Sequence, residues 1–290
     1  MVLAATTPEF EAFGPWIDRV TSIESVPRLY KGHAIDFEAA RLVLKVPRNI
    51  ARREATPGMD LYDHLLIAGD RSLVVLSRSG DWYSNSTIEY SSIVAISESL
   101  NVLDGSLTLY TANDREYSID FNGAGSRAIS ELVEVIRADA TPDPVSPYGA
   151  APNLSALGTQ DTMLVGTLRE LQKREPSLRV TAAHGRGSVG YRSGLRRALG
   201  RTHVLGGMIV ATTATELHII SRLDWVNVLK KPDLSRRHTV INLESIRSVR
   251  SEPHPDYEGL VELTIRMESN RYTVVVPEGS DAARAIQSLK

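Results

Sequence analysis

The chain has 290 residues, of which 42% are hydrophobic and 23% are charged, with a formal net charge of −2 and no cysteine. This length and composition predict a folded protein of two domains, and the absence of cysteine excludes disulfides, thiolate metal sites and cysteine nucleophiles. The small net charge excludes a global attraction to nucleic acid or acidic lipid, so an anionic partner would have to be bound by local basic patches.

Residues 1–40 are predicted to be a helical lead-in. MVLAATTPEFEAF lacks a basic region ahead of an apolar run, so we expect no signal peptide. Residues 9–26 form an amphipathic stretch that ends at Pro27. No stretch of the chain reaches the roughly 20 apolar residues of a membrane span. The expected location is therefore the cytoplasm, with peripheral contact to a membrane as the alternative.

Residues 41–138 are predicted to form the first β-rich domain. Short apolar or alternating segments between turn residues are typical of strands. Six of them occur here: LLIA, LVVLS, TIEY, IVAIS, LTLYT and YSIDF. The following stretch, SRAISELVEVIR (126–137), has apolar residues at helical spacing, which predicts a helix with one apolar face.

A linker and a second β-rich domain follow. Prolines and small polar residues in 139–160 predict a semi-extended linker, and a helix is predicted over 161–177, where Pro176 stops it. Residues 178–290 are predicted to form the second domain. Its strands are MIVAT, LHIIS, TVINL, IRSVR, VELTI and YTVVV, and AARAIQSLK closes it as a helix.

The two β-rich domains form an internal repeat. LVVLSRSGDW (73–82) aligns with LHIISRLDW (217–225), and IEYSSIVAI (88–96) aligns with INLESIRSV (241–249). This alignment places Trp82 opposite Trp225. We interpret the two tryptophans as equivalent core residues, because bulky residues at matched positions are usually structural.

The order of elements resembles that of bacterial pleckstrin-homology-like (PH-like) domains, and is compatible with a bacterial or phage origin. The residues that carry the resemblance are Ile88, Tyr90, Ile93 and Ile96 in the first copy, and Ile241, Leu243, Ile246 and Val249 in the second. Leucine replaces tyrosine in the second copy. The resemblance implies an α+β, mostly β fold of two tandem PH-like domains. Each would be an antiparallel meander or partly open barrel capped by a C-terminal helix.

A G-x-G-x-x-G pattern occurs at Gly185, Gly187 and Gly190. A dinucleotide site needs such a turn between a strand and a crossover helix, followed by an acidic residue about 20 positions later. The segment after the glycines is short and contains Gly194, and no Asp or Glu occurs from Pro176 to Thr215. A nucleotide-binding enzyme is therefore the least favoured of three hypotheses.

Basic residues without neighbouring carboxylates form the candidate anion-binding site. They are Arg186, Arg192, Arg196, Arg197, Arg201, Lys230, Lys231, Arg236 and Arg237. The resemblance implies that the last four lie in a loop of the kind that binds phosphoinositide headgroups in eukaryotic PH domains. Arginine also suits bidentate phosphate contacts. The alternative is a set of solvated loops that keep the protein soluble.

The leading expectation is a non-enzymatic adaptor that binds a protein partner or self-associates through its PH-like domains, using exposed sheet edges. Peripheral binding of anionic phospholipid through the basic loops is the alternative. Nucleic acid is not an expected partner, because aromatic residues for base stacking are not interleaved with the basic ones. No cofactor, catalytic residue or metal site is expected. Asp60, Asp63 and His64 are interpreted as surface residues.

Overall fold

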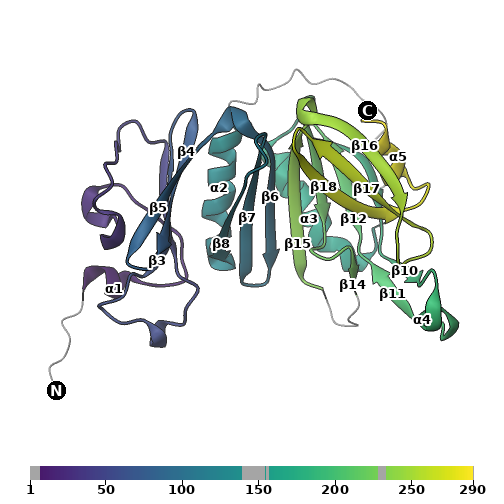
Figure 1. The fold of residues 1–290 in the computed structure, drawn as a ribbon, viewed down its shortest axis with the longest axis horizontal. Helices are drawn as coiled ribbons and strands as arrows, with labels where there is room; N and C mark the ends of the chain where they lie inside the picture. Colours follow the sequence, from purple (N-terminus) through teal and green to yellow (C-terminus); the bar gives the residue numbers. More distant parts are fainter. Residues whose placement is uncertain (1–6, 139–153, 155–156, 228–232, 290) are drawn as a thin grey trace. The chain divides into compact units, whose positions relative to one another are not determined.

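The computed structural model describes residues 7–138, 154, 157–227 and 233–289 (Figure 1). Its antiparallel sheets and few helices confirm the predicted α+β, mostly β class. The chain divides into two compact units. Unit 1 comprises Met1–Ile93, Val102–Leu107 and Ser118–Ala140, and unit 2 comprises Val94–Asn101, Thr108–Tyr117 and Thr141–Lys290. Most of the predicted linker (139–160) lies outside the described residues.

All six strands predicted for the first copy are present, and the predicted helix 126–137 coincides with α2. The elements are α1 (Pro8–Ala12), β1 (Asp18–Arg19), β2 (Leu42–Pro47), β3 (Tyr62–Ala68), β4 (Ser72–Ser79), β5 (Trp82–Glu89), β6 (Ile93–Asn101), β7 (Asp104–Thr111), β8 (Glu116–Asn122) and α2 (Ser126–Arg137).

The prediction of a helical lead-in over 1–40 is wrong for most of the part that the structure describes. Only α1 is α-helical, and it is followed by β1 and short 3-10 turns. Gly14 and Pro15 come directly after the C-cap residue Phe13, and proline disfavours the helical conformation in the residue before it. The segment instead contributes core residues, since Phe13 and Tyr30 are buried against the first sheet.

Unit 1 contains a five-stranded antiparallel sheet in the order β1-β2-β3-β4-β5. One of its cores joins the lead-in to this sheet, with Tyr30, Leu65 and Leu76 fully buried. The Tyr30 hydroxyl donates to the carbonyl oxygens of Asp63 (2.8 Å) and Tyr62 (3.2 Å). Helix α2 packs on β2 and β3.

All six strands predicted for the second copy are also present, together with a further group of short strands. The elements are α3 (Thr162–Arg174), β9 (Arg179–His184), β10 (Gly187–Gly190), α4 (Gly194–Ala198), β11 (Thr202–Leu205), β12 (Met208–Thr212), β13 (Glu216–Ser221), β14 (Val226–Asn227), β15 (Ser235–Asn242), β16 (Ile246–Pro253), β17 (Leu260–Met267), β18 (Asn270–Pro277) and α5 (Asp281–Gln287). The predicted helix over 161–177 is α3.

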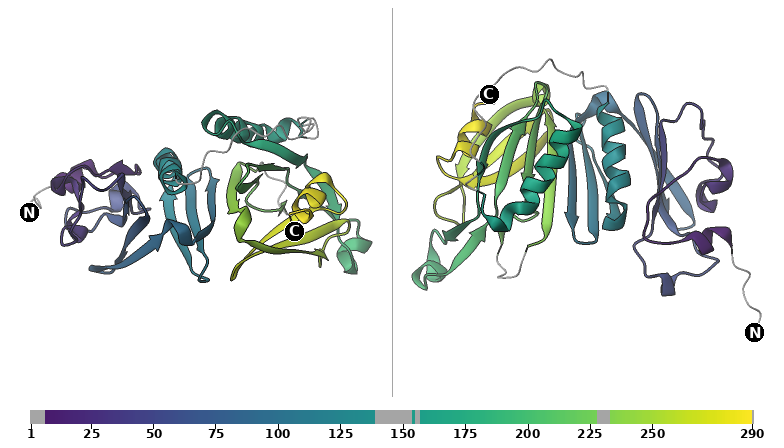
Figure 2. Two further views of the ribbon diagram at one scale, coloured as in Figure 1. Left: turned by 90° about the horizontal axis from the view of Figure 1, so that it is seen from above. Right: turned by 180° about the vertical axis from the view of Figure 1, so that it is seen from behind.

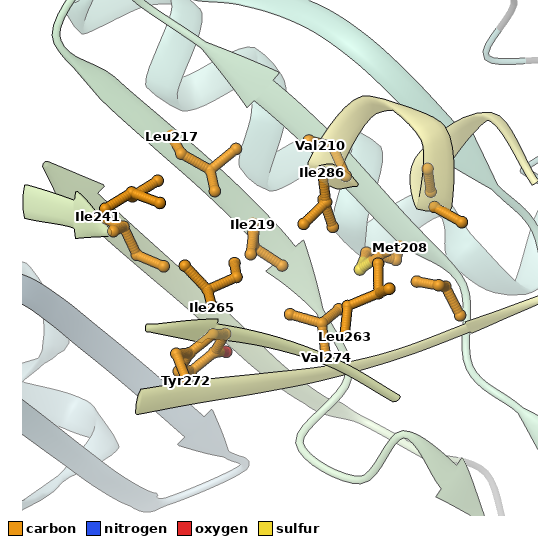
Figure 3. Close-up of a cluster of buried hydrophobic side chains, with 14 of the residues drawn as sticks. Met208, Val210, Leu217, Ile219, Ile241, Leu263, Ile265, Tyr272, Val274 and Ile286 are labelled. Atoms are coloured by element: carbon orange, nitrogen blue, oxygen red, sulfur yellow. The ribbon is translucent and has the colours of Figure 1, made fainter. Parts of the chain in front are cut away.

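Unit 2 is built around two sheets. Strands β15, β13, β12 and β9 are neighbours in one antiparallel sheet, and β6 pairs with β15 from Ala95↔Ile241 to Asn101↔Ser235. Strands β16, β17 and β18 form the other sheet. Figure 3 shows the core between them, where Ile219, Leu263, Val274 and Ile286 point toward one another.

Helix α3 covers the opposite face of the β9–β12–β13–β15 sheet, as Figure 2 shows from behind. Leu164 and Leu168 of α3 pack there against Ile209 and Ile220. Because side chains alternate along a strand, β13 turns Leu217 and Ile219 to one layer and Glu216, His218 and Ile220 to the other. The whole strand is buried.

The element order is the same in the two copies. Strands β2–β5 correspond to β9, β12, β13 and β15, strands β6–β8 correspond to β16–β18, and α2 corresponds to α5. The aligned sequences IEYSSI and INLESI form equivalent 3-10 turns, Tyr90–Ser92 and Leu243–Ser245. The second copy differs by the insertion of β10, α4, β11 and β14.

The interpretation of Trp82 and Trp225 as equivalent core residues is wrong for Trp82, which is 73% exposed at the start of β5. Trp225 is half-buried and packs against the main core of unit 2 and against the cluster that contains Val189 and Leu205. Val189 and Leu205 belong to β10 and β11, in the inserted segment. The first copy has no such insertion, so Trp82 lacks the part of this packing that β10 and β11 supply to Trp225.

Candidate functional site

The structure separates the nine candidate anion-binding residues into several places. Arg192, Arg196, Arg197 and Arg201 lie together between β10 and β11, whereas Arg186 lies before β10, and Arg236 and Arg237 lie on β15. Lys230 and Lys231 lie outside the described residues.

The first four arginines belong to a projecting hairpin, whose end, residues 191–202, is called the tip below. Figure 1 shows α4 at the end of the β10–β11 hairpin, extending away from the two sheets of unit 2. Residues 193–202 are all exposed. Leu195 and Leu199 are 76% and 60% exposed, in the midst of Arg196, Arg197 and Arg201.

The base of the tip is built from packed aromatic rings. The rings of Tyr191 and Tyr257 lie 5.3 Å apart, and the His203 ring contacts both. His203 Nδ1 lies 2.8 Å from the Tyr257 hydroxyl, and its Nε2 lies 3.3 Å from the Tyr191 hydroxyl. Burial, reinforced by the neighbouring Tyr191, raises the pKa of Tyr257. Val189 and Leu205 anchor the hairpin to this cluster and to Leu260.

Two tip arginines are held by this base. The Arg196 guanidinium lies 5.3 Å from the Tyr191 ring centroid and donates to its hydroxyl at 3.1 Å. Arg197 donates to the carbonyl oxygen of Arg192 at 2.7 Å, and it approaches the exposed carboxylate of Glu258 at 3.3 Å. These contacts fix the direction of the guanidinium groups while their side chains stay exposed.

The glycine pattern is not a nucleotide-type turn. Gly187 and Gly190 are the ends of β10, which pairs antiparallel with β11 in the register Gly187↔Leu205 to Gly190↔Thr202. The segment that follows is the five-residue helix α4. A phosphate-binding turn between a strand and a crossover helix is therefore not what these glycines form.

The expectation that Arg236 and Arg237 lie in a loop is wrong, because both are strand residues whose side chains make internal contacts. Arg236 lies 3.3 Å from the Glu98 carboxylate, and Arg237 lies 5.9 Å from the Trp225 ring. Arg186 is exposed, and its backbone N–H donates to buried Asp161 at 3.2 Å. None of these three lies on the tip.

Asp60, Asp63 and His64, which are interpreted from the sequence as surface residues, are half-buried and take part in ion pairs and hydrogen bonds. Asp60 accepts from Arg28 at 2.7 Å, and Asp63 accepts from Arg78 at 2.8 Å. His64 Nδ1 lies 2.9 Å from the Ser77 hydroxyl on the neighbouring strand.

A polar groove of about 550 Å³ beside the β16–β17–β18 sheet was not predicted from the sequence. Its lining includes the basic residues Arg250, Arg266 and Arg271 and the acidic residues Asp114 and Glu116. Arg266 and Arg271 face each other in the β17–β18 register. Alternation of side chains along each strand indicates which of its residues share a face. Which residues of neighbouring strands then lie opposite each other depends on how the strands pair, and the sequence does not show this pairing.

A cluster of half-buried Glu175 with buried Glu216 and His218 in unit 2 was also not predicted from the sequence. The ligand atoms of the three side chains all lie within 4.8 Å of one another. His218 Nε2 is 3.5 Å from Glu216 Oε2 and 4.0 Å from Glu175 Oε2. Glu216 and His218 are two apart on one strand, which is a visible signal, but Glu175 comes from the end of α3, 41 residues before Glu216.

No protein-family model and no curated protein matches the chain. Among the described residues, no helix combines the length and the apolar character needed to cross a membrane.

Proposed function

We propose that the chain is a non-enzymatic binding protein of two tandem PH-like domains, and that the tip of the second domain docks on an anionic lipid surface. The repeated order of four strands, three strands and a helix supports the tandem PH-like interpretation. The observation that carries the function is the tip itself, where Leu195 and Leu199 project to solvent among arginines.

A lipid surface provides an apolar interior for the leucines of the tip and a negatively charged surface for its arginines. The acyl region removes leucine side chains from water, which contributes about 1.5–3 kcal/mol for each side chain that is fully buried. Basic residues near an anionic leaflet contribute about 1 kcal/mol each. In free solution the arginines are hydrated but the two leucines remain in contact with water.

Nucleic acid fits the tip less well. Binding to single strands relies on aromatic faces on which bases stack, but Tyr191 and Tyr257 pack against His203 at the base of the tip. The residues presented at the end are leucines and arginines. Leucine side chains add little free energy to the binding of a polar phosphate backbone, but they add a great deal when they are buried in a lipid interior.

Vesicle flotation of the full chain tests this proposal. We expect binding to phosphatidylserine-containing vesicles, weaker binding as salt increases, and little binding to phosphatidylcholine alone. Leu195→Ser/Leu199→Ser should lower the partition coefficient at least tenfold. Arg196→Gln/Arg197→Gln should lower it and reduce its salt dependence.

Two matched variants serve as controls. Val102→Ser/Leu103→Ser changes another exposed apolar pair, 61% and 56% exposed, and Arg41→Gln/Arg71→Gln removes two positive charges from exposed residues of unit 1. Both should bind vesicles as the unchanged chain does. Equal loss in the control and tip variants, or no binding by the unchanged chain, would contradict lipid docking by the tip.

A second candidate function, protein binding, is favoured by strand β5. It is the last strand in its sheet order, and its sequence WYSNSTIE carries no charge before Glu89. Edge strands that lack lysine, proline or a bulge readily pair with another chain. Trp82 lies exposed at the start of this edge.

Size-exclusion chromatography with light scattering tests self-association through β5. The unchanged chain should show a mass above that of the monomer, and Trp82→Lys should return it to the monomer, whereas Leu103→Lys should not. A monomer at every concentration would exclude self-pairing through this edge.

A further inference from the structure

The buried cluster of Glu175, Glu216 and His218 has the geometry of a metal site. Glu216 and His218 are two residues apart on β13, so both turn toward the layer covered by α3. Glu175 is the C-cap residue of α3. The end of the helix thus places a carboxylate against the two strand residues.

His218 provides an independent indication of a ligand. Its side chain is fully buried, and its Nε2 has no hydrogen-bond partner although it is aimed at two carboxylates. A buried polar atom without a hydrogen-bond partner is destabilising, because it has lost its contacts with water and gained none in the protein. A cation held by the nitrogen and both carboxylates would remove this destabilisation.

The second ring nitrogen of His218 is already engaged. His218 Nδ1 lies 3.1 Å from His238 Nε2, and the two rings stack with centroids 5.3 Å apart. When Nδ1–H donates to His238, the lone pair of His218 is on Nε2, toward the carboxylates. Such an outer hydrogen bond fixes the tautomer of metal-bound histidines in known sites.

We propose that Glu175, Glu216 and His218 bind one divalent transition-metal ion of the Zn²⁺ class. Imidazole nitrogen and carboxylate oxygen are zinc ligands at about 2.0–2.2 Å, so donors in a tetrahedral site lie roughly 3.4 Å apart. The 3.5 Å separation of His218 and Glu216 matches this value. Glu175 Oε2 lies 4.0 Å from His218 Nε2, and its side chain is 26% exposed. A small movement of this side chain would bring its carboxylate to the ion.

The three ligands also predict which metal ions the site selects and that one coordination position of the ion stays open. Mg²⁺ and Ca²⁺ prefer oxygen ligands throughout, so the histidine disfavours them. Three protein ligands leave a fourth position for water. Glu175 borders the surface, which gives the ion and this water an entry path.

Titration of the chelator-treated full chain with Zn²⁺ by calorimetry tests the proposal. Co²⁺ serves as a spectroscopic probe, since tetrahedral coordination gives intense visible bands. We expect one ion per chain, a higher thermal midpoint with Zn²⁺, and no effect of Mg²⁺. Glu175→Gln should weaken Zn²⁺ binding at least tenfold, and His238→Gln should weaken it about tenfold through the ring orientation.

Glu170→Gln is the matched control, because Glu170 lies on the same helix but is exposed and paired with Lys173. It should bind Zn²⁺ as the unchanged chain does. Glu175 lies at a helix end and is partly exposed, so its glutamine variant is expected to fold, which circular dichroism verifies. Absence of saturable Zn²⁺ and Co²⁺ uptake, or equal uptake by Glu175→Gln, would overturn the proposal.

Discussion

The side-chain hydroxyls of Thr239 and Tyr272 lie 2.9 Å apart in the interior of unit 2, joining β15 to β18. Ser97 of β6 extends the contact, with its hydroxyl 3.0 Å from that of Thr239. All three residues are buried. One threonine therefore connects three strands that are remote in sequence.

Thr239→Val is expected to lower the free energy of unfolding by about 1–3 kcal/mol, because it removes hydrogen bonds from two buried hydroxyls while keeping the side-chain shape. Urea denaturation followed by circular dichroism measures the change. Thr181→Val is the control, since Thr181 pairs with Thr212 at the exposed surface and its change should stay within about 0.5 kcal/mol. Equal changes in the free energy of unfolding for the two variants would show that the buried hydroxyl contact is no more stabilising than the exposed one.

Gly105→Ala is expected to destabilise unit 1. A Cβ at Gly105 would lie 2.4 Å from the ring of Phe121, which is buried, and overpacking of this kind costs about 1–3 kcal/mol. Adding Phe121→Leu to Gly105→Ala should recover part of the loss. Urea midpoints of the single and double variants measure both effects, and a non-additive recovery is the diagnostic result.

Alkaline pH should unfold the chain through its buried tyrosines. Burial raises the pKa of Tyr30, Tyr62, Tyr110 and Tyr272. Because the unfolded tyrosines ionise near pH 10, the unfolded chain releases protons first, and the free energy of unfolding falls as pH rises above about 10. Phenolate absorbance should therefore rise together with the loss of circular dichroism.

Tyr62→Phe sharpens this test, because the Tyr62 hydroxyl is buried without a hydrogen-bond partner. Its removal should keep or slightly raise stability at neutral pH and shift the alkaline midpoint upward. A lower midpoint would show that the hydroxyl is stabilising in the folded chain.

Acidification should destabilise the chain through two histidines. Burial lowers the pKa of His64 and His184. The unfolded histidines bind protons near pH 6.5, above the pH at which the folded ones do, so the free energy of unfolding falls as pH decreases below about 6.5. Urea midpoints across this range for the unchanged chain and for His184→Gln measure it, and the variant should lose less stability.

The local elements were predictable because they depend on short-range patterns. The helical spacing of Ile129, Leu132 and Ile136 predicted α2, and the alternation in YSIDF predicted β8. The lead-in was not predictable, because an amphipathic pattern over 9–26 is equally compatible with an irregular chain that buries Phe13 and Val20 on a sheet. Proline after Gly14 stops the helix whatever the pattern predicts.

The candidate sites also divide into features that are visible along the chain and contacts that depend on strand pairing. The tip arginines were found from sequence, because charge without a nearby carboxylate is visible along the chain. The interpretation of Arg237 failed since its position beside Trp225 depends on strand pairing. The spacing of Glu216 and His218 on one strand was visible in the sequence, but the approach of Glu175 to them was not, because it depends on where helix α3 ends against the sheet.

By itself, the sequence determined the α+β class, the internal repeat, the twelve predicted strands and the helices α2, α3 and α5, since backbone propensity and the alternation of apolar residues act over a few positions. The tertiary structure decided which arginines share a surface and which strands pair. It also decided that Glu175 meets His218, because such contacts join residues far apart in the chain and depend on the register of sheets and the end of a helix.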